Sequence, residues 1–248
     1  MDNKFKPETL CVQAGWQPKK GEPRVLPIYQ STTFKYETSE QMAKLFDLEE
    51  SGYFYTRLQN PTNEAVAAKI AALEGGVAAM LTSSGQAASF FAFFNICEAG
   101  DHIVSATSIY GGTYNLLAVT LKKLGIECTF VDQDASEEEI SKAFRPNTKA
   151  MFGEMISNPG VMVLDVEKFA RIAHNHGVPL IVDNTFATPI NSVRSNGERI
   201  SLRTPRLNIW MAMPRAWVVV SWTAVISIGK RMPRSSRDFA NRTLLTTD

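Results

Sequence analysis

Short apolar runs alternate with longer amphipathic segments from about residue 77 to residue 190. An apolar run of four or five residues is typical of a strand buried on both faces of a parallel sheet. Such runs predict strands at residues 77–81, 102–106, 127–131, 149–153 and 178–182. The segments between them predict helices at residues 86–98, 113–124 and 166–176, and another that opens at Ser136, where Glu139 completes a capping box. This alternation with short connections predicts an α/β fold with a parallel, three-layer αβα sheet.

The first 60 residues have a different pattern, because they lack a long periodic segment and are rich in Pro, Thr and Tyr. We expect them to form an extended arm with short helices, one of them between Thr38 and Glu50. Asn60-Pro61 signals a turn or the start of a helix, and Thr62 is a candidate cap for a helix over residues 63–73.

Composition limits the class of protein. A hydrophobic content of 44% and a charged content of 21% are ordinary for a soluble globular protein. No apolar run reaches transmembrane length, and residues 1–7 do not have the pattern of a signal peptide, so we expect a cytoplasmic location. The three cysteines lie far apart without metal-ligand spacing, which favours reduced thiols and predicts no metal site.

The charge distribution breaks near residue 192. Residues 1–191 carry 16 Lys and Arg against 22 Asp and Glu, whereas residues 192–248 carry 10 against 3. The same last stretch contains nine of the thirteen arginines and three of the four tryptophans. Such an asymmetry fits a basic tail that binds nucleic acid, or residues that were never selected as protein.

Candidate chemistry lies where the predicted strands end, because the carboxyl ends of parallel strands form the ligand-binding edge of an open sheet. Asp183 directly follows the strand at residues 178–182. A buried carboxylate there is costly unless it meets a cation or a protonated ligand nitrogen. Ser84, Gly85 and Gln86 follow the strand at residues 77–81, where glycine permits close approach and free helix N–H groups suit a phosphate, although Ser-Ser-Gly is also a common turn.

Further polar and aromatic residues could join this edge. Tyr110 follows the strand at residues 102–106 and could stack on a flat ligand ring or simply pack on its glycine turn. Asn158 adds an amide after the strand at residues 149–153. Tyr55 and Arg57 are two residues apart and face the same way on an extended segment, so they suit a phosphate, or Arg57 is an ordinary surface ion.

Five motifs occur together in the same order as in a known family. They are Tyr55-Thr-Arg57 with Asn60-Pro-Thr62, Ser83-Ser-Gly-Gln-Ala87, Tyr110-Gly-Gly-Thr113, Ser157-Asn-Pro159 and Val182-Asp-Asn-Thr185. From about residue 8 to Ile190 the chain resembles the Cys/Met-metabolism family of pyridoxal-phosphate (PLP) enzymes, and within it the O-acetylhomoserine sulfhydrylase branch.

The resemblance implies the large domain of a fold type I PLP transferase, similar to aspartate aminotransferase, with a role for each motif. The turn at Ser84, Gly85 and Gln86 holds the cofactor phosphate, and Tyr55 and Arg57 reach it from a neighbouring subunit of a homotetramer. Tyr110 stacks on the pyridine ring, Asn158 touches its 3-oxygen, and Asp183 pairs with its protonated nitrogen. Thr185, in the same motif as Asp183, is a further expected cofactor contact.

The resemblance also implies a reaction, the replacement of acetate by sulfide on O-acetylhomoserine to give homocysteine. The implied partners are therefore small molecules, with no nucleic acid and no membrane. A cystathionine γ-synthase or a methionine γ-lyase is the alternative within the family. The alternative of another class is a non-catalytic fragment or a basic-tailed binding protein.

One departure from the family is a missing lysine. These enzymes need a lysine that holds the cofactor covalently, in a Ser-x-Thr-Lys-Tyr-x-Asp-Gly-His-Ala stretch some 25 residues beyond the aspartate. The sequence from Arg203 to Val218 contains no such stretch, and no lysine lies between Lys168 and Lys230.

The genetic code offers an explanation for this departure. Each codon can be read from the third base of one residue through the second base of the next. The shifted codons that begin with the third base of the Trp210, Met211 and Met213 codons must then encode aspartate, glycine and alanine. The shifted codon that begins with the third base of the Leu207 codon allows lysine. The shifted frame thus admits the missing family stretch, so we interpret the chain from near Ser192 onward as out-of-frame translation.

We therefore expect three parts. Residues 1–60 form the arm that contributes to a neighbouring subunit, residues 61–191 form a partial PLP-binding domain, and residues 192–248 form an out-of-frame basic tail. On this interpretation the chain lacks the last strands of the cofactor domain and the C-terminal small domain, and it is catalytically inactive without the lysine.

Overall fold

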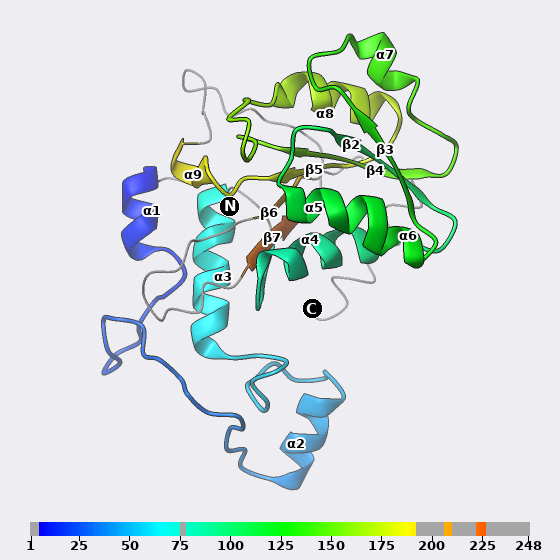
Figure 1. Cartoon of the computed structure of the whole chain (residues 1–248). Coiled ribbons are helices and arrows are strands. Elements are labelled where there is room, and N and C mark those ends of the chain that lie inside the picture. The colour runs from blue at the N-terminus through cyan, green and yellow to red at the C-terminus, as the bar shows by residue number, and fades with distance from the viewer. Residues whose placement is uncertain (1–4, 75–77, 192–205, 210–221, 227–248) are drawn as a thin grey trace.

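A seven-stranded sheet runs through the computed structural model of the chain, which describes residues 5–74, 78–191, 206–209 and 222–226 (Figure 1). The strands are β1 (Ala78–Thr82), β2 (His102–Ala106), β3 (Glu127–Val131), β4 (Thr148–Glu154), β5 (Leu180–Asp183), β6 (Arg206–Ile209) and β7 (Trp222–Ile226). Their order is β1-β7-β6-β5-β4-β2-β3. Only β7 is antiparallel, to β1 on one side and to β6 on the other, so the other six strands run in one direction.

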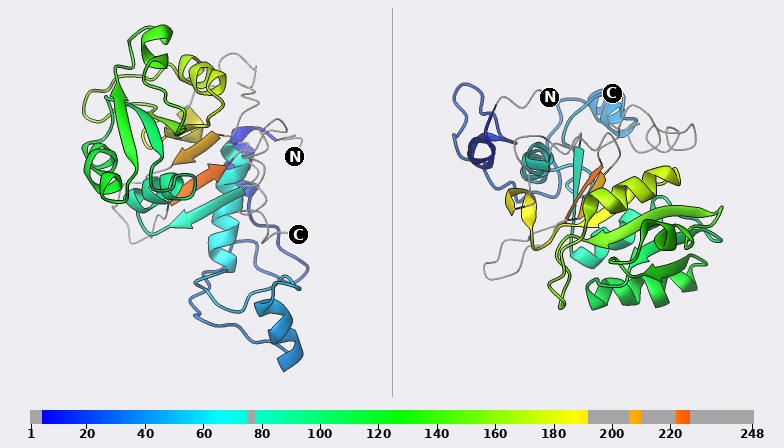
Figure 2. Two further views of the ribbon diagram at one scale, coloured as in Figure 1. Left: turned by 90° about the vertical axis from the view of Figure 1, so that its right-hand side faces the viewer. Right: turned by 90° about the horizontal axis from the view of Figure 1, so that it is seen from above.

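Helices cover both faces of this sheet. Helices α4 (Gly85–Phe94), α5 (Gly111–Asn115) and α6 (Leu121–Lys123) lie on one face, and α7 (Glu137–Ser141) and α8 (Val166–Asn175) lie on the other (Figures 1 and 2). Helix α3 (Pro61–Glu74) packs against β1 and β7, and the short α9 (Thr188–Asn191) lies beside it. The architecture is therefore the predicted three-layer α/β fold.

The strand order reverses at one place in the sheet. From β2 the chain continues outward to β3, then returns to form β4 on the other side of β2 and continues through β5. The segments that leave β2 and β4 at their carboxyl ends therefore depart in opposite directions. Such a switch point opens a crevice at the carboxyl edge, where ligands of α/β proteins bind.

The hydrophobic core explains why the apolar runs become central strands. Every residue of β2 and of β5 is buried, as expected for strands covered on both faces. The Phe93 ring of α4 meets the Phe152 ring of β4 edge-on at 5.3 Å between centroids, and both side chains are fully buried. On the other face, the fully buried Phe169 of α8 completes the sandwich.

Most predicted elements are confirmed, with shifted ends. Strands β2 and β3 have the predicted bounds, and the cap of α7 is confirmed because the Ser136 hydroxyl accepts a hydrogen bond from the backbone N–H of Glu139 at 3.2 Å. The helix predicted at residues 113–124 is continuous but contains a π-helical turn, η1 (Leu116–Thr120), between α5 and α6. A π-turn adds a residue to one turn of helix, which hydrophobic spacing alone does not reveal.

The predicted cap of α3 is wrong. The side chain of Asn60, not Thr62, accepts the hydrogen bond at this helix start, from the backbone N–H of Thr62 at 2.9 Å. The hydroxyl of Thr62 instead donates to the carbonyl of Pro27 and accepts from the N–H of Tyr29, each at 3.0 Å. Thr62 therefore ties the arm to α3, because helix start and arm meet at this point.

Two segments of the tail, for which the sequence predicted no secondary structure, pair within the sheet. Strand β6 pairs with β5, and β7 closes the gap between β6 and β1. Strand pairing uses backbone groups, and the β7 sequence Trp-Thr-Ala-Val-Ile has high strand propensity, which accounts for its pairing in the sheet. The out-of-frame interpretation otherwise concerns residues 192–205, 210–221 and 227–248, which lie outside the described residues.

The N-terminal segment is extended, with α1 (Pro7–Gln13) beside α3 and α2 (Ser39–Phe46) far from the sheet (Figure 1). The Thr38 hydroxyl caps α2 by accepting from the N–H of Gln41 at 3.1 Å. Large apolar side chains stay exposed along this arm, among them Val25, Ile28 and Leu58.

Candidate active site

Asp183 is the last residue of β5 and lies at the carboxyl edge of the sheet with only 4% of its surface exposed. Its Oδ1 atom accepts two hydrogen bonds from Thr185, one from the backbone N–H at 3.0 Å and one from the hydroxyl at 2.5 Å. Burial nevertheless raises the pKa of the Asp183 carboxyl above its ordinary value, against the lowering effect of Thr185. Among the described residues no group donates to Oδ2, so this oxygen can accept from a ligand.

Glu154 is a second buried carboxyl at the same edge, and the sequence analysis did not single it out. It ends β4, is 3% exposed, and lies in register with Asp183 of the neighbouring β5. Its Oε2 atom accepts a hydrogen bond from the backbone N–H of Tyr110 at 2.6 Å. Burial and, to a smaller extent, the charge of Asp183 raise the pKa of Glu154 to about 7, against the lowering effect of the N–H groups of Tyr110 and Asn158.

Tyr110 stands on the short connection from β2 to α5, immediately before the first residue of that helix. Its ring lies against the backbone of Gly112, where an added Cβ would be 2.5 Å from the ring atom Cε1. The ring is 36% exposed, so one part of it packs and another part faces outward. A partly exposed aromatic ring at the switch point can stack on a flat ligand.

The turn from β1 into α4 has the geometry of an anion site. The Ser84 hydroxyl accepts from the backbone N–H of Ala87 at 3.1 Å and so caps α4. The N–H groups of Gly85 and Gln86 belong to the first turn of this helix, which has no carbonyl acceptor one turn back, so they can bind an anion. The Gln86 side chain donates from Nε2 to the Thr113 hydroxyl at 3.2 Å, which links this turn to α5.

The structure brings most of the predicted site residues to one edge. Six of them stand at the carboxyl ends of β1, β2, β4 and β5 or just beyond: Ser84, Gly85, Gln86, Tyr110, Asn158 and Asp183. Asn158 follows β4 and is half-buried, and its backbone N–H lowers the pKa of Glu154. Thr185, proposed as a cofactor contact, donates a hydrogen bond from its hydroxyl to Asp183 and so orients the acid.

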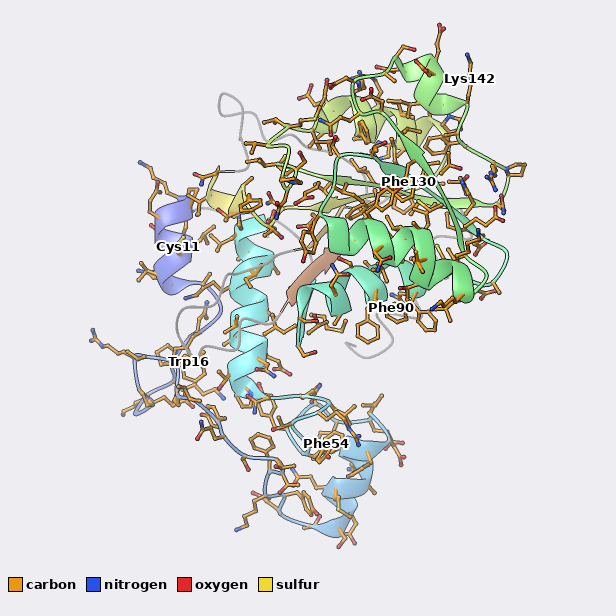
Figure 3. The ribbon with its side chains drawn as sticks, in the orientation of Figure 1. Cys11, Trp16, Phe54, Phe90, Phe130 and Lys142 are labelled. Carbon is orange, nitrogen blue, oxygen red and sulfur yellow. The ribbon has the colours of Figure 1, made fainter. Side chains whose placement is uncertain are left out.

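Tyr55 and Arg57 are not at this edge within the same chain. They belong to the arm, where Tyr55 forms an isolated bridge with Thr33, and the neighbouring Phe54 lies beside α2, well away from the sheet (Figure 3). The Arg57 guanidinium lies over the Tyr55 ring at 5.0 Å from its centroid. The pair thus presents a cation and a phenol together, as predicted, but not to the crevice of its own chain.

The residues at the carboxyl edge fit PLP. The first turn of α4 suits its phosphate, the Tyr110 ring suits its flat ring, and Oδ2 of Asp183 suits a protonated ring nitrogen. Among the described residues no group of three or more His, Cys, Asp or Glu side chains could hold a metal ion. No helix in the described part of the chain is long and apolar enough to cross a membrane.

Comparison with known proteins gives consistent matches. Residues 8–194 match the family described as Cys/Met metabolism PLP-dependent enzyme. The chain is 45% identical over 190 residues to the O-acetyl-L-homoserine sulfhydrylase of Leptospira meyeri, which covers 76% of this chain and 43% of the relative. It is 48% identical over 182 residues to the protein of the same name from Corynebacterium glutamicum, with 73% and 42% covered. The chain spans less than half the length of these curated relatives.

A solved structure agrees with the sequence matches. A Campylobacter jejuni crystal structure, described as an O-acetylhomoserine (thiol)-lyase with N'-pyridoxyl-lysine-5'-monophosphate, superposes with a TM-score of 0.71 at 38% identity. The superposition covers 75% of this chain and 46% of that one. The matched part is therefore a part of a fold type I PLP enzyme.

Proposed function

The chain belongs to the Cys/Met metabolism family of PLP-dependent enzymes, and we propose from this premise that it carries the cofactor-binding part of an O-acetylhomoserine sulfhydrylase. The proposed reaction replaces the acetate of O-acetylhomoserine with sulfide and yields homocysteine. The sulfhydrylase names of several relatives support this choice over a cystathionine synthase or a lyase.

The observation that carries the proposal is the environment of Asp183. This acid is buried at the end of a central parallel strand, with Oδ1 held by Thr185 and Oδ2 without a hydrogen-bond donor among the residues that the structure describes. An ionised carboxyl in such a place needs a cationic partner to offset the loss of hydration. A protonated pyridine nitrogen is such a partner, and PLP when bound supplies an electron sink whose strength depends on that protonation.

The other residues of the carboxyl edge would bind and orient the cofactor. The N–H groups of Gly85 and Gln86 would hold the phosphate, with Ser84 at the cap of the same turn. Tyr110 would cover one face of the ring and exclude water from it, and the Asn158 amide would contact the 3-oxygen. Thr185 would keep Asp183 in position through its two hydrogen bonds.

We further propose that Tyr55 and Arg57 complete the phosphate site of a neighbouring subunit in a homotetramer. Their place on an extended arm, away from the crevice of their own chain, supports an action in trans. The arm over residues 1–60 and the cofactor-binding part over residues 61–191 would then belong to two adjacent sites.

As written, the chain is proposed to bind PLP without turning over substrate. No lysine lies between Lys168 and Lys230, so the stretch after Asp183 offers no amine to hold the cofactor covalently and to move protons. The out-of-frame interpretation of residues 192–248 explains this absence.

The experiment compares the chain as written with a version expressed from a gene in which one base is restored near codon 192. Each protein is mixed with PLP, treated with borohydride and mapped by mass spectrometry. Binding of PLP is expected in both proteins. A borohydride-fixed lysine in the restored stretch, and formation of homocysteine from O-acetylhomoserine and sulfide, are expected only in the restored protein.

Three outcomes contradict parts of the proposal. Homocysteine formation by the chain as written refutes its inactivity. A gene in which no one-base correction opens a long reading frame refutes the frame interpretation. Absence of PLP binding in both proteins refutes the assigned function, and nucleic-acid binding that weakens with salt and is lost on deleting residues 192–248 would favour the basic-tail alternative.

A further inference from the structure

Glu154 has no part in the proposed function, yet it lies at the same edge of the sheet as Asp183. Strands β2 and β4 flank the switch point, and Glu154 is the last residue of β4. It lies in register with Asp183 across the β4–β5 pair and is 3% exposed. A buried carboxyl is costly, so its position needs an interaction that offsets the loss of hydration.

The interaction is a bridge across the crevice. Oε2 of Glu154 accepts from the backbone N–H of Tyr110 at 2.6 Å, and the backbone N–H of Asn158 acts on the same carboxyl by lowering its pKa. Tyr110 follows β2 and Asn158 follows β4, so the two donors belong to segments that leave the sheet in opposite directions. A carboxylate has two acceptor oxygens and can hold both segments at once.

The turn that carries Tyr110 has no cap of its own. Tyr110 occupies the N-cap position of α5, where its side chain makes no capping hydrogen bond. Three side-chain contacts hold this turn among the described residues: the Glu154 carboxyl at the Tyr110 backbone, the Ser108 hydroxyl on the Met162 sulfur, and the Gln86 amide on the Thr113 hydroxyl one helical turn further on. Glu154 therefore fixes the backbone from which the Tyr110 ring projects.

We propose that Glu154 is a positioning residue that sets the plane of the Tyr110 ring against the cofactor and holds Asn158 at the same edge. The inference rests on the proposed binding of PLP at the carboxyl edge. It adds a residue that acts through Tyr110 and Asn158 and touches neither the cofactor nor the substrate.

The charges support a coupling between Glu154 and ligand binding. Asp183 is the charged side chain that acts on Glu154 among the described residues, and with burial it raises the pKa of Glu154 to about 7. A protonated ring nitrogen on Asp183 would offset that repulsion and lower the pKa of Glu154. Tight binding thus favours the ionised Glu154, and affinity should rise with pH through the region near 7.

The test compares Glu154→Gln with the exposed control Glu138→Gln on α7. Glutamine keeps the size but replaces one acceptor oxygen with a donor and removes the charge, so one of the two N–H groups loses its acceptor. PLP affinity is expected to fall about tenfold in Glu154→Gln, the effect of one lost charge-assisted hydrogen bond, and to stay unchanged in the control. The circular dichroism of bound PLP should weaken, and the pH dependence near 7 should disappear.

A double-mutant cycle separates positioning from general stability. In a Tyr110→Ala background, Glu154→Gln is expected to change PLP affinity less than twofold, because the ring that it orients is absent. An equal tenfold loss in both backgrounds would overturn the inference. Equal affinity, dichroism and pH dependence in wild type and Glu154→Gln would also overturn it, while leaving the proposed function intact.

Amide hydrogen exchange of the wild-type chain tests the bridge even if Glu154→Gln does not fold. The Tyr110 amide is expected to exchange at least tenfold more slowly than the amide of the exposed Gly111 beside it. Equal exchange rates would mean that the hydrogen bond to Glu154 does not persist in solution, which would overturn the inference. Lack of PLP binding by folded wild type would instead refute the proposed function.

Discussion

The Asp183 carboxyl is stabilised by Thr185 and destabilised by burial, and its raised pKa shows that burial has the larger effect. A carboxyl with a raised folded-state pKa contributes stability at low pH that is lost as the pH rises through that pKa. At neutral pH the cofactor-free chain therefore keeps a carboxyl that opposes folding. The proposed pairing with a cationic ligand would account for this unfavourable residue.

Asp183→Asn is expected to raise the stability of the cofactor-free chain at pH 7 by ~1–3 kcal/mol, because the amide removes a buried charge whose loss of hydration outweighs its hydrogen bonds from Thr185. The same change is expected to weaken PLP binding, because an amide oxygen is a poorer partner for a protonated nitrogen. Urea unfolding and cofactor titration measure the two effects. A variant that is less stable than wild type at pH 7 and that binds PLP as tightly would contradict this account.

The environment of His102 predicts that stability changes with pH in the opposite direction. Its ring is fully buried at the start of β2, where Nδ1 meets the Thr148 hydroxyl and Nε2 meets the Thr129 hydroxyl, each at 2.8 Å. Burial lowers the pKa of His102, the charge of Arg145 lowers it further, and Glu127 opposes the shift. A lowered pKa means that the stability contributed by the neutral ring is lost as the pH falls below about 6.5.

His102→Gln is therefore expected to cost about 1–3 kcal/mol at pH 8, where the wild-type ring is neutral and fully hydrogen-bonded. The difference should shrink toward pH 5, because the wild type alone must then bury a charge or release a proton. Unfolding free energies measured from pH 5 to 8 test this prediction. A difference that stays constant over this range would assign the acid sensitivity to other groups.

At the scale of an element, the start of α5 contains two adjacent glycines with different surroundings. A Cβ on Gly112 would lie 2.5 Å from the Tyr110 ring, whereas a Cβ on Gly111 would meet no atom within 4 Å. Both changes to alanine favour the helix by ~1 kcal/mol. They differ only in whether they displace the ring.

Gly112→Ala is expected to weaken PLP binding roughly three- to tenfold, since an aromatic stacking contact contributes ~0.5–1.5 kcal/mol. Gly111→Ala is the matched control and should bind PLP as the wild type does. Cofactor titration with thermal unfolding of both variants distinguishes loss of the ring from loss of the fold. Equal affinities in the two variants would show that the Tyr110 ring does not contact the cofactor.

The sequence predicted these elements better than it predicted their side-chain contacts. Buried strands such as β2 and β5 follow from local hydrophobicity, so their positions could be recognised from the chain alone. The capping of α3 by Asn60 could not be recognised from the chain alone, because the hydrogen-bond partners that occupy the Thr62 hydroxyl are residues 27 and 29 of the arm. Contacts between distant segments leave no local pattern.

Glu154 was missed although a signal was present. Like Asp183, it is a carboxylate that ends an apolar strand, and the reasoning that selected one residue applies equally to the other. The sequence does not show that β4 and β5 are adjacent in the sheet, and this adjacency places the two acids side by side. The strand order also depends on β6 and β7, whose part in the sheet was not predicted.

At the scale of the whole molecule, the N-terminal arm is the part whose large apolar side chains remain exposed. Val25 and Ile28 are each more than three-quarters exposed, and the part of the arm around Phe54 lies well away from the sheet (Figure 3). Exposed apolar groups along an extended segment indicate a surface that packs against another subunit. The phosphate site would then depend on assembly.

Arg57→Ala is expected to weaken PLP binding only under conditions where the protein is assembled. Wild-type affinity should fall on dilution through the dissociation of the assembly, measured by sedimentation, and the variant should bind weakly at every concentration. Lys35→Ala on the same arm serves as a charge-matched control. A wild-type affinity that does not change on dilution would contradict an action in trans.

The position of β7 also affects how the protein folds. Strand β1 has β7 as its strand neighbour, and Ala78 pairs with Ile226, 148 positions later in the chain. Pairings over such distances form slowly, because a long loop must close before any contact stabilises it. The turn at Ser84 is made early on the ribosome, yet β1 joins the described sheet only after β7 has been synthesised. The turn after β1, which is the proposed phosphate site, should therefore be the last part of the binding site to be assembled.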